Sequence, residues 1–416
     1  HGTGGPLGVS DLKDPHPLTR AWVRGVQEFG LPYNADFNGA TQYGVGYYQT
    51  TTRNAQRCSA SQGYLHPAMK RRNLKVVTKQ TVTRIVLAAG RAVAVEAESG
   101  GETRRYRAER EVIVAGGAIG SAKLLQLSGI GDPEHLGRVG VEVQHALRGV
   151  GRNLQDHCDL DIVYELKDYQ SLDRLAKIRP YTAGAGLEYI LFKRGPLTST
   201  LVEGGAFSYA QDDAQTPDLQ FHFLPGAGVE AGIAKLKAGY GCTLNSYFLH
   251  PLSRGSVMIE SADPSAPPAI DPNYVADEHD LEMSAEGLRQ MQAMMAQPSM
   301  APLIKKELLM GGRTLATRDD RIRYVREHGR TAYHPVGTCA MGDSDDAVVS
   351  AELRVHGLEG LRVVDASVMP RIVSSNTQAP TVMIAEKASD MILGVPPLSP
   401  MTSGQATTPV GARGEG

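Results

Sequence analysis

The fold of this chain is decided by residues 111–127, which read EVIVAGGAIGSAKLLQL. The apolar run at 111–115 has the composition of a short buried strand. Gly116 and Gly117 then allow a tight turn, and residues 119–127 have a helical pattern. A strand, a glycine turn and a helix in this order are the usual start of a nucleotide-binding crossover, so the sequence predicts an α/β fold.

The sequence on either side of this unit predicts further strands and helices. Residues 81–87 and 92–97 have strand patterns, and Gly90 and Arg91 between them indicate a hairpin turn. Further strands are expected at 74–77, 218–223, 253–259 and 361–364. Helices are expected at 17–29, 280–295, 321–328 and, between Pro380 and Gly394, at 381–393.

Composition and charge argue against several classes of function. The 416 residues are 41% hydrophobic and 21% charged, with a formal net charge of −2. This charge gives no electrostatic reason to expect nucleic acid or an anionic membrane as a partner. No apolar run approaches the ~20 residues that a membrane-spanning helix needs, so no transmembrane segment is expected.

The four cysteines, Cys58, Cys158, Cys242 and Cys339, are far apart and form no C-x-x-C pair. This spacing argues against a disulfide scaffold and a structural zinc site, so reduced thiols are expected. His334 and Cys339 alone do not supply enough ligands, and no metal site is expected. The expected location is the cytoplasm, with peripheral attachment to a membrane as the alternative.

Several stretches of the sequence form one combined pattern. They are RCSA at 57–60, GAIGSAKLLQLSGIG at 117–131, GVGRNLQDH at 149–157, SRG at 253–255, YHPVGT at 333–338, LRVVDAS at 361–367 and SNTQAP at 375–380. Together they resemble the glucose-methanol-choline (GMC) family of flavin oxidoreductases, in particular its choline-dehydrogenase-like branch, although Ala122 stands where the family signature has Pro or Ser. The resemblance covers residues 1–394 and implies FAD as the cofactor.

The sequence departs from the family pattern at one important place. The resemblance implies an initial strand, a G-x-G-x-x-G turn and a helix that hold the FAD pyrophosphate, then a second glycine-rich segment, and neither is present. The opening HGTGGPL matches a loop downstream of both, so the sequence is expected to begin inside a longer protein. GAGVEA at 226–231 is expected to be a flexible loop, because no acidic partner follows about 20 residues later.

His334 is the candidate catalytic base. Oxidation of an alcohol needs a base for the hydroxyl proton, and a histidine with an unperturbed pKa of ~6.5 exchanges a proton near neutrality. Pro335 favours an extended backbone at His334, and Gly337 allows the chain to turn closely past a ring. The imidazole is therefore expected at a strand end, while for any one of the twelve histidines a core or surface position is the alternative.

The resemblance implies that Asn376 is the second catalytic residue, because the family pairs the histidine with His or Asn here. Its amide can donate a hydrogen bond to the substrate oxygen, and a turn or helix-entry residue is the alternative. The helix after Pro380 would direct its free N–H groups and positive dipole end at the N1–C2=O edge of the flavin. Thr377 and Gln378 would supply nearby contacts, with helix capping as the alternative for Thr377.

The resemblance also implies a set of cofactor-binding residues. They are Val82, Ala115, Gly116, Tyr333, Asp365, Ala366, Thr377 and Gln378. Asp365 matches a residue near the ribose and phosphate, and Ala115 and Gly116 would approach the cofactor closely because glycine has no side chain. Val82 matches a residue whose backbone meets the adenine, and Tyr333 would pack on the flavin. A turn residue is the alternative for Asp365, and a plain strand residue for Val82.

Substrate contacts are less well defined by the sequence. Glu203 could face a cationic group, although a structural or solvated carboxylate is the favoured interpretation. His66, His157 and His222 are expected to be structural. Trp22 is the only tryptophan, and no choline-type aromatic cage is evident.

The resemblance implies two discontinuous domains. Residues 46–157 and 334–394 would form the α/β FAD-binding domain. Residues 158–333, with 1–45 as a further segment or linker, would form an α+β substrate domain with an antiparallel sheet and helices on one side. Residues 395–416, rich in Pro, Ser, Thr and Gly, are expected to be disordered. Without its first βαβ unit the parallel sheet would expose apolar surface, which predicts poor solubility or molten behaviour.

The expected function is FAD-dependent oxidation of an alcohol to an aldehyde or ketone. His334 would take the hydroxyl proton, Asn376 would hold the oxygen, and hydride would move to flavin N5, with a quinone or another acceptor receiving the electrons. The alternatives are an oxygen-using oxidase, a FAD-containing hydroxynitrile lyase, and an inactive fragment or half of a split enzyme that needs a partner chain. A serine hydrolase is disfavoured because no G-x-S-x-G elbow occurs.

Overall fold

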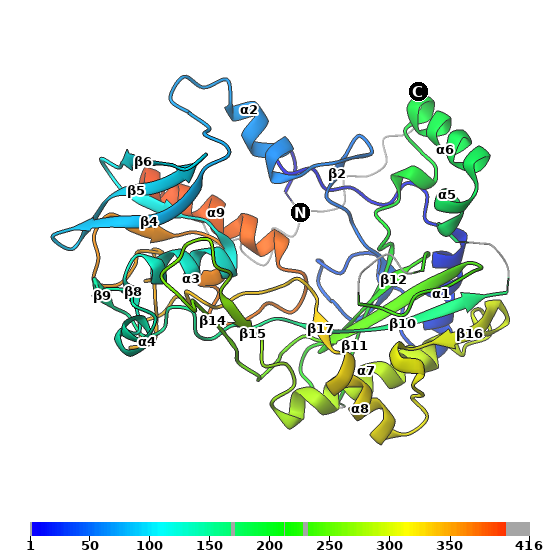
Figure 1. Cartoon of the computed structure of the whole chain (residues 1–416). Coiled ribbons are helices and arrows are strands. Elements are labelled where there is room, and N and C mark those ends of the chain that lie inside the picture. The colour runs from blue at the N-terminus through cyan, green and yellow to red at the C-terminus, as the bar shows by residue number, and fades with distance from the viewer. Residues whose placement is uncertain (1, 168–170, 212, 228–231, 397–416) are drawn as a thin grey trace.

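The computed structural model describes residues 2–167, 171–211, 213–227 and 232–396 and has two halves that lie side by side (Figure 1). One half contains a large antiparallel sheet, and the other contains a parallel strand pair and a three-stranded sheet. Each half has its own cluster of buried apolar side chains. Nearly all of the expected tail at 395–416, and most of the GAGVEA stretch at 226–231, lie outside the described residues.

The large sheet has seven strands, which pair antiparallel throughout. In spatial order they are β1 (Gly44–Tyr47), β11 (Gly204–Ser208), β12 (Leu219–Leu224), β13 (Gly241–Phe248), β10 (Cys158–Leu166) and β16 (Ile304–Leu308), with β17 (Arg330–Thr331) on β10. Three helices lie on one side of it: α1 (Pro17–Phe29), α7 (Glu278–Met295) and α8 (Arg318–His328) (Figure 1). The expected antiparallel sheet with helices on one side is therefore observed.

Alternate residues of these strands have different tasks, because side chains of a strand point to opposite faces in turn. Phe221 and Phe223 of β12 and Leu244 of β13 belong to the core under the helices, where Trp22 of α1 stacks on Phe223 at 5.1 Å. The residues between them are polar and face the other side, which leaves that face of the sheet available for a site.

The second half is built around the unit that the opening stretch predicts. β7 (Val112–Val114) runs into α3 (Gly117–Leu127), and β7 pairs in parallel with β18 (Leu361–Val363). β4 (Thr81–Ala88), β5 (Arg91–Ser99) and β6 (Glu102–Arg107) form the three-stranded sheet, and α9 (Gln378–Leu393) follows β18.

The remaining α-helices and strands are short, except for α6. They are β2 (Thr52–Arg53), β3 (Gln56–Arg57), α2 (His66–Ala68), β8 (Ile130–Gly131), α4 (Pro133–Arg138), β9 (His145–Ala146), α5 (Asp173–Lys177), α6 (Arg179–Phe192), β14 (Ser256–Met258) and β15 (Ala269–Asp271). None of the described helices is both long and apolar enough to cross a membrane.

Some expectations about individual elements are wrong, including the start of α8, which is Arg318 rather than 321. Residues 74–77 do not form a strand, because no other described strand pairs with them, and their apolar side chains are exposed. The last helix starts at Gln378 rather than 381, so Pro380 lies inside its first turn. A proline is tolerated there because the first N–H groups of a helix have no partner within the helix.

Candidate functional site

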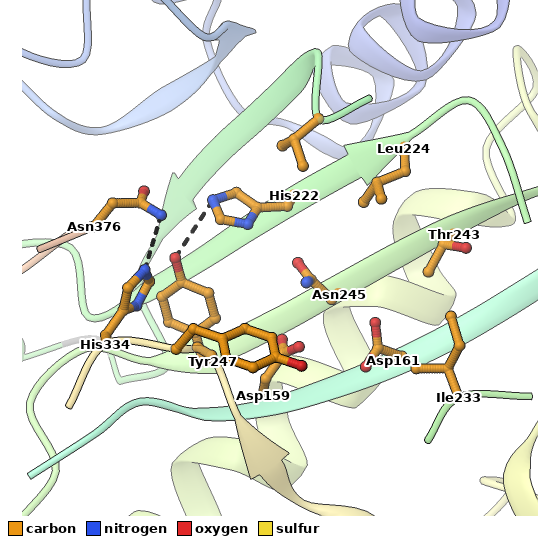
Figure 2. A pocket seen from close by; sticks show the side chains of 13 residues that line it. Asp159, Asp161, His222, Leu224, Ile233, Thr243, Asn245, Tyr247, His334 and Asn376 are labelled. Carbon is orange, nitrogen blue, oxygen red and sulfur yellow. Dashed lines mark hydrogen bonds between the residues drawn. The ribbon is translucent and has the colours of Figure 1, made fainter. Parts of the chain in front are cut away.

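A pocket of about 180 Å³ lies on the face of the large sheet opposite the helices (Figure 2). Strands β10, β12 and β13 supply its polar lining, and a loop after β17 and the segment before α9 complete it. The lining residues used below are Asp159, Asp161, His222, Thr243, Asn245, Tyr247, Tyr333, His334 and Asn376.

The structure brings the two expected catalytic residues into direct contact. Asn376 Nδ2 lies 3.0 Å from His334 Nε2, although the residues are 42 positions apart in the sequence (Figure 2). The His334 side chain is largely buried, whereas Asn376 is exposed. A polar pair at the edge of a pocket can therefore meet a hydroxyl group that enters it.

The backbone before His334 is held by a buried carboxylate. Asp156 Oδ1 accepts a hydrogen bond from His334 N at 2.9 Å, and Oδ2 accepts from the hydroxyls of Thr331 and Tyr274, each at 2.5 Å. Burial raises the pKa of Asp156, and these hydrogen bonds partly offset that effect. Tyr333 has a φ of 61°, so His334 follows a left-handed residue rather than the end of a straight strand.

A second histidine supports the first. His157 Nδ1 lies 3.0 Å from His334 Nδ1, and His157 Nε2 lies 3.2 Å from the carbonyl oxygen of Leu249. The His157 ring stacks on Tyr247, with centroids 4.8 Å apart. Sequence reasoning assigned His157 a structural role only, and it also placed His222, which lines the pocket, in that class.

Burial keeps these histidines neutral near pH 7, because desolvation disfavours the charged ring. It lowers the pKa of His334 to about 4 and that of His222 to about 3. Burial, with a smaller contribution from His334, lowers the pKa of His157 well below its usual value. An uncharged His334 can accept a proton, which is what a general base requires.

Asn376 is oriented from the sheet. Gln220 Nε2 donates to Asn376 Oδ1 at 3.1 Å and to the Tyr48 hydroxyl at 2.8 Å. Tyr48 in turn donates to the carbonyl oxygen of Phe221 at 3.0 Å. Polar residues alternate with apolar ones in β12 and β13, and this pattern could have indicated a polar face that includes Gln220. The pattern does not indicate that this face lines a pocket.

Two carboxylates line the pocket, and Glu203 is not one of them. Asp159 and Asp161 line the pocket, and both form salt bridges with Arg330, at 3.1 and 2.8 Å. Glu203 is fully buried under α1, where its carboxylate accepts hydrogen bonds from His16 N, the Thr19 hydroxyl and the Ser199 hydroxyl. These contacts agree with its structural interpretation.

The expected cofactor residues that follow β7 and β18 lie at one edge, because the carboxyl ends of parallel strands meet there. Ala115 and Gly116 are exposed at this edge. Asp365 is buried, and its oxygens accept from Gly117 N at 2.9 Å, Ser121 Oγ at 2.5 Å and Ser367 N at 2.8 Å. The carboxylate thus fixes the turn that Ala115 and Gly116 begin, with Ala366 beside it.

The other expected cofactor residues are distributed over three elements. Val82 of β4 is 40% exposed and Tyr333 is 66% exposed. Thr377 is buried at the start of α9, and Gln378 is exposed, with its side-chain oxygen 3.1 Å from the Thr51 hydroxyl. Within the described ranges no side chain caps the start of α9, so its N–H groups remain available directly after Asn376.

These features fit a dinucleotide cofactor such as FAD. A Cβ atom built at Gly117 meets nothing within 4 Å, which leaves open space at the turn after β7. The uncapped start of α9 offers backbone donors and a positive dipole end to an electron-rich ring edge. The turn after β7 and the start of α9 both adjoin residues that the family resemblance implies for cofactor binding.

The cysteines take no part in this arrangement. All four are buried free thiols, and burial raises the pKa of Cys339 to about 12. Among the residues that the structure describes, no group of three or more His, Cys, Asp or Glu side chains could hold a metal ion.

Comparison with known proteins gives consistent matches. Two family models, both described as GMC oxidoreductase, match residues 3–159 and 251–385. The chain is 38% identical to an alcohol dehydrogenase [acceptor] of Pseudomonas putida, with 94% of the chain and 71% of that protein covered. It is 40% identical to the oxygen-dependent choline dehydrogenase 1 of Chromohalobacter salexigens, covering 96% and 72%. Its structure is similar to an Aspergillus oryzae formate oxidase studied for FAD modification, with a TM-score of 0.87, 26% identity and coverage of 94% and 73%.

Proposed function

This chain belongs to the GMC oxidoreductase family, and we propose that it oxidises a small alcohol to an aldehyde or ketone at the His334–Asn376 pair. The family, the fold class and FAD as the cofactor agree with the expectations from sequence. The observation that carries the proposal is the 3.0 Å contact between His334 Nε2 and Asn376 Nδ2 at the edge of the pocket.

His334 acts as the base in this proposal. Its neutral ring takes the hydroxyl proton at Nε2, because burial keeps its pKa at about 4. The Asn376 amide donates to the alcohol oxygen, which takes the position where the two side chains now meet each other. FAD, when bound, supplies the acceptor for the hydride. The buried Asp156 keeps the backbone of His334 in place during the reaction.

The cofactor would be held at the edge formed by β7, β18 and the start of α9. Exposed backbone at Ala115 and Gly116, and the free N–H groups at Gln378, support this placement. The full set proposed to contact FAD is Val82, Ala115, Gly116, Tyr333, Asp365, Ala366, Thr377 and Gln378. Asp365 would act mainly by fixing the turn, since its oxygens already accept three hydrogen bonds.

The electron acceptor is proposed to be a quinone or a similar acceptor in the cytoplasm or at a membrane surface. The similarity to an alcohol dehydrogenase [acceptor] supports this choice. The relatives described as oxygen-dependent favour oxygen as the second candidate. Peroxide formed in proportion to product would identify oxygen as the acceptor. Anaerobic bleaching of the flavin by alcohol would exclude a hydroxynitrile lyase.

A further segment or partner chain is proposed to cover the parallel strands. β7 and β18 form a sheet of only two strands, and Ile113 of β7 is 46% exposed. Parallel sheets are normally covered on both faces, so this surface is suited to additional strands and helices. The FAD-binding half would then consist of 46–157 and 334–394, and the substrate half of 1–45 and 158–333.

The proposal is tested with His334→Ala in the FAD-loaded protein. Loss of the base should lower kcat/KM for alcohol by about 10²- to 10⁴-fold. His145→Gln is the matched control, because His145 lies in β9 and does not line the pocket. Unchanged alcohol turnover in His334→Ala would refute the assignment.

A further inference from the structure

We propose that His157 is a positioning residue that fixes the proton of His334 on Nδ1, so that Nε2 faces the pocket without a proton. The consequence for turnover rests on the proposed function, whereas the position of the proton does not. A neutral imidazole has one nitrogen that donates and one that accepts, and the partner of each ring decides which is which.

The first chain of hydrogen bonds begins at a backbone carbonyl. The Leu249 oxygen can only accept, so His157 Nε2, at 3.2 Å, carries a hydrogen. In a neutral ring, His157 Nδ1 is then the acceptor. His334 Nδ1, at 3.0 Å, must therefore donate, and this leaves His334 Nε2 with a free lone pair.

The surroundings of His157 support its neutral state. The ring has no exposed surface and stacks on Tyr247 at 4.8 Å. Burial and the neighbouring His334 lower the pKa of His157 well below its ordinary value. A doubly protonated His157 would face its Nδ1–H against the Nδ1–H of His334.

A second series of hydrogen bonds reaches the His334 ring from its Nε2 side. The Phe221 oxygen accepts from the Tyr48 hydroxyl at 3.0 Å, so the Tyr48 oxygen is free to accept from Gln220 Nε2 at 2.8 Å. The Gln220 amide also donates to Asn376 Oδ1 at 3.1 Å, and it lies 3.0 Å from His222 Nε2. This orientation turns Asn376 Nδ2 towards His334.

The two series of hydrogen bonds require the same tautomer of His334. Asn376 Nδ2 donates at 3.0 Å, which requires that His334 Nε2 accepts. The opposite tautomer would place two donors against each other at Nε2 and two acceptors against each other at Nδ1. The two anchoring carbonyls belong to different segments, β12 and the residue after β13, so the agreement does not arise from one local geometry.

The consequence is a base that needs no change of tautomer before it takes a proton, once the alcohol has displaced the hydrogen bond from Asn376 to Nε2. The Nε2 lone pair is directed at the position proposed for the alcohol oxygen, between His334 and Asn376. His157 does not line the pocket, so it acts through His334 alone. Its replacement should affect kcat more than KM.

The experiment measures the tautomer directly, by NMR of the FAD-loaded protein labelled with ¹⁵N-histidine at pH 7. His334→Gln identifies the His334 signals by their loss. His157→Leu removes the acceptor at Nδ1, and His157→Asn keeps an oxygen acceptor near that position. His145→Gln is the control, since His145 bonds to the carbonyl oxygen of His356 and lies outside the site.

The wild-type protein and His157→Asn should carry the His334 proton on Nδ1. In His157→Leu the Asn376 amide still donates to Nε2, so we expect a mixture of the two His334 tautomers in place of one, and a fall in kcat with little change in KM. A wild-type His334 protonated on Nε2, or an unchanged tautomer in His157→Leu, would overturn the inference. If the tautomers follow this pattern but no alcohol is turned over, the inference stands and the proposed function fails.

Discussion

The His334 ring is buried and has a polar neighbour at each nitrogen. Its burial sets the pH range in which it can accept a proton. Its pKa lies at about 4 because burial disfavours the charged ring. His334 is therefore neutral throughout the physiological range. Near neutrality, its capacity to accept a proton does not depend on pH.

The pH profile of kcat/KM for alcohol oxidation tests this assignment. Activity should be constant from neutrality down to about pH 5 and fall tenfold per pH unit below about pH 4, because protonated His334 has no lone pair at Nε2. The sign follows from the lowered pKa, since activity is lost as pH falls through it. A loss of activity centred near the ordinary histidine pKa would contradict the burial argument.

At this scale the sequence predicted part of the residues that line the pocket. His334 and Asn376 were predicted from motifs, whereas the site positions of His157, His222 and Gln220 were missed. A single histidine in an alternating strand such as β12 has the same local pattern whether it faces a pocket or a core. Only the packing of the helices on the other face decides that His222 points into the pocket.

The loop that carries His334 requires a glycine at position 337, and the sequence predicted only part of the reason. Gly337 was expected to let the chain pass close to a ring. In the structure it has a φ of 92°, and a Cβ at this position would lie 2.3 Å from the carbonyl oxygen of Asn153. Gly337 therefore allows the strand-like segment after His334 to pass against the 149–157 stretch.

Gly337→Ala should destabilise the protein by at least about 2 kcal/mol, because left-handed backbone alone costs an L-residue about 1–2 kcal/mol and the overlap adds to it. Chemical denaturation measures the free energy of unfolding. Gly137→Ala is the control, since that helical glycine has open space at its Cβ and no positive φ. Equal stability of the two variants would show that the loop can move aside.

Helices and turns that have a local sequence pattern were predicted well. A strand whose formation depends on pairing with another segment was not. The span of α1 was predicted to the residue, and the β7–turn–α3 unit is present. The hairpin at 81–97 was also found, although its left-handed turn residues are Ala89 and Gly90. Residues 74–77 failed because a strand requires a neighbour that local sequence does not reveal.

The whole molecule exposes apolar surface at the parallel strands and at two neighbouring elements of the same half. Ile113 of β7 is 46% exposed, Val82 of the antiparallel strand β4 is 40% exposed, and α9 buries only Ile384 and Ala388 among its 16 residues. Surface of this kind is normally covered by further structure. The chain alone is therefore expected to have incomplete packing in its FAD-binding half.

Heating this chain without a partner should give a broad transition, with weak near-UV circular dichroism and binding of a hydrophobic dye. The exposed parallel strands and α9 are the physical reason. Differential scanning calorimetry measures the width of the transition. A single sharp, cooperative melt would show that the exposed surface needs no cover.

The period-two alternation in β10, β12 and β13 has a consequence for how such an enzyme can diversify. Odd positions in β10 and β13 and even positions in β12 line the pocket, while the residues between them fill the core. Preference for a new alcohol can thus arise at Asp161, Thr243 or Asn245 without altering the packing beneath. Selection for substrate preference and selection for stability therefore act on alternate residues of the same strands.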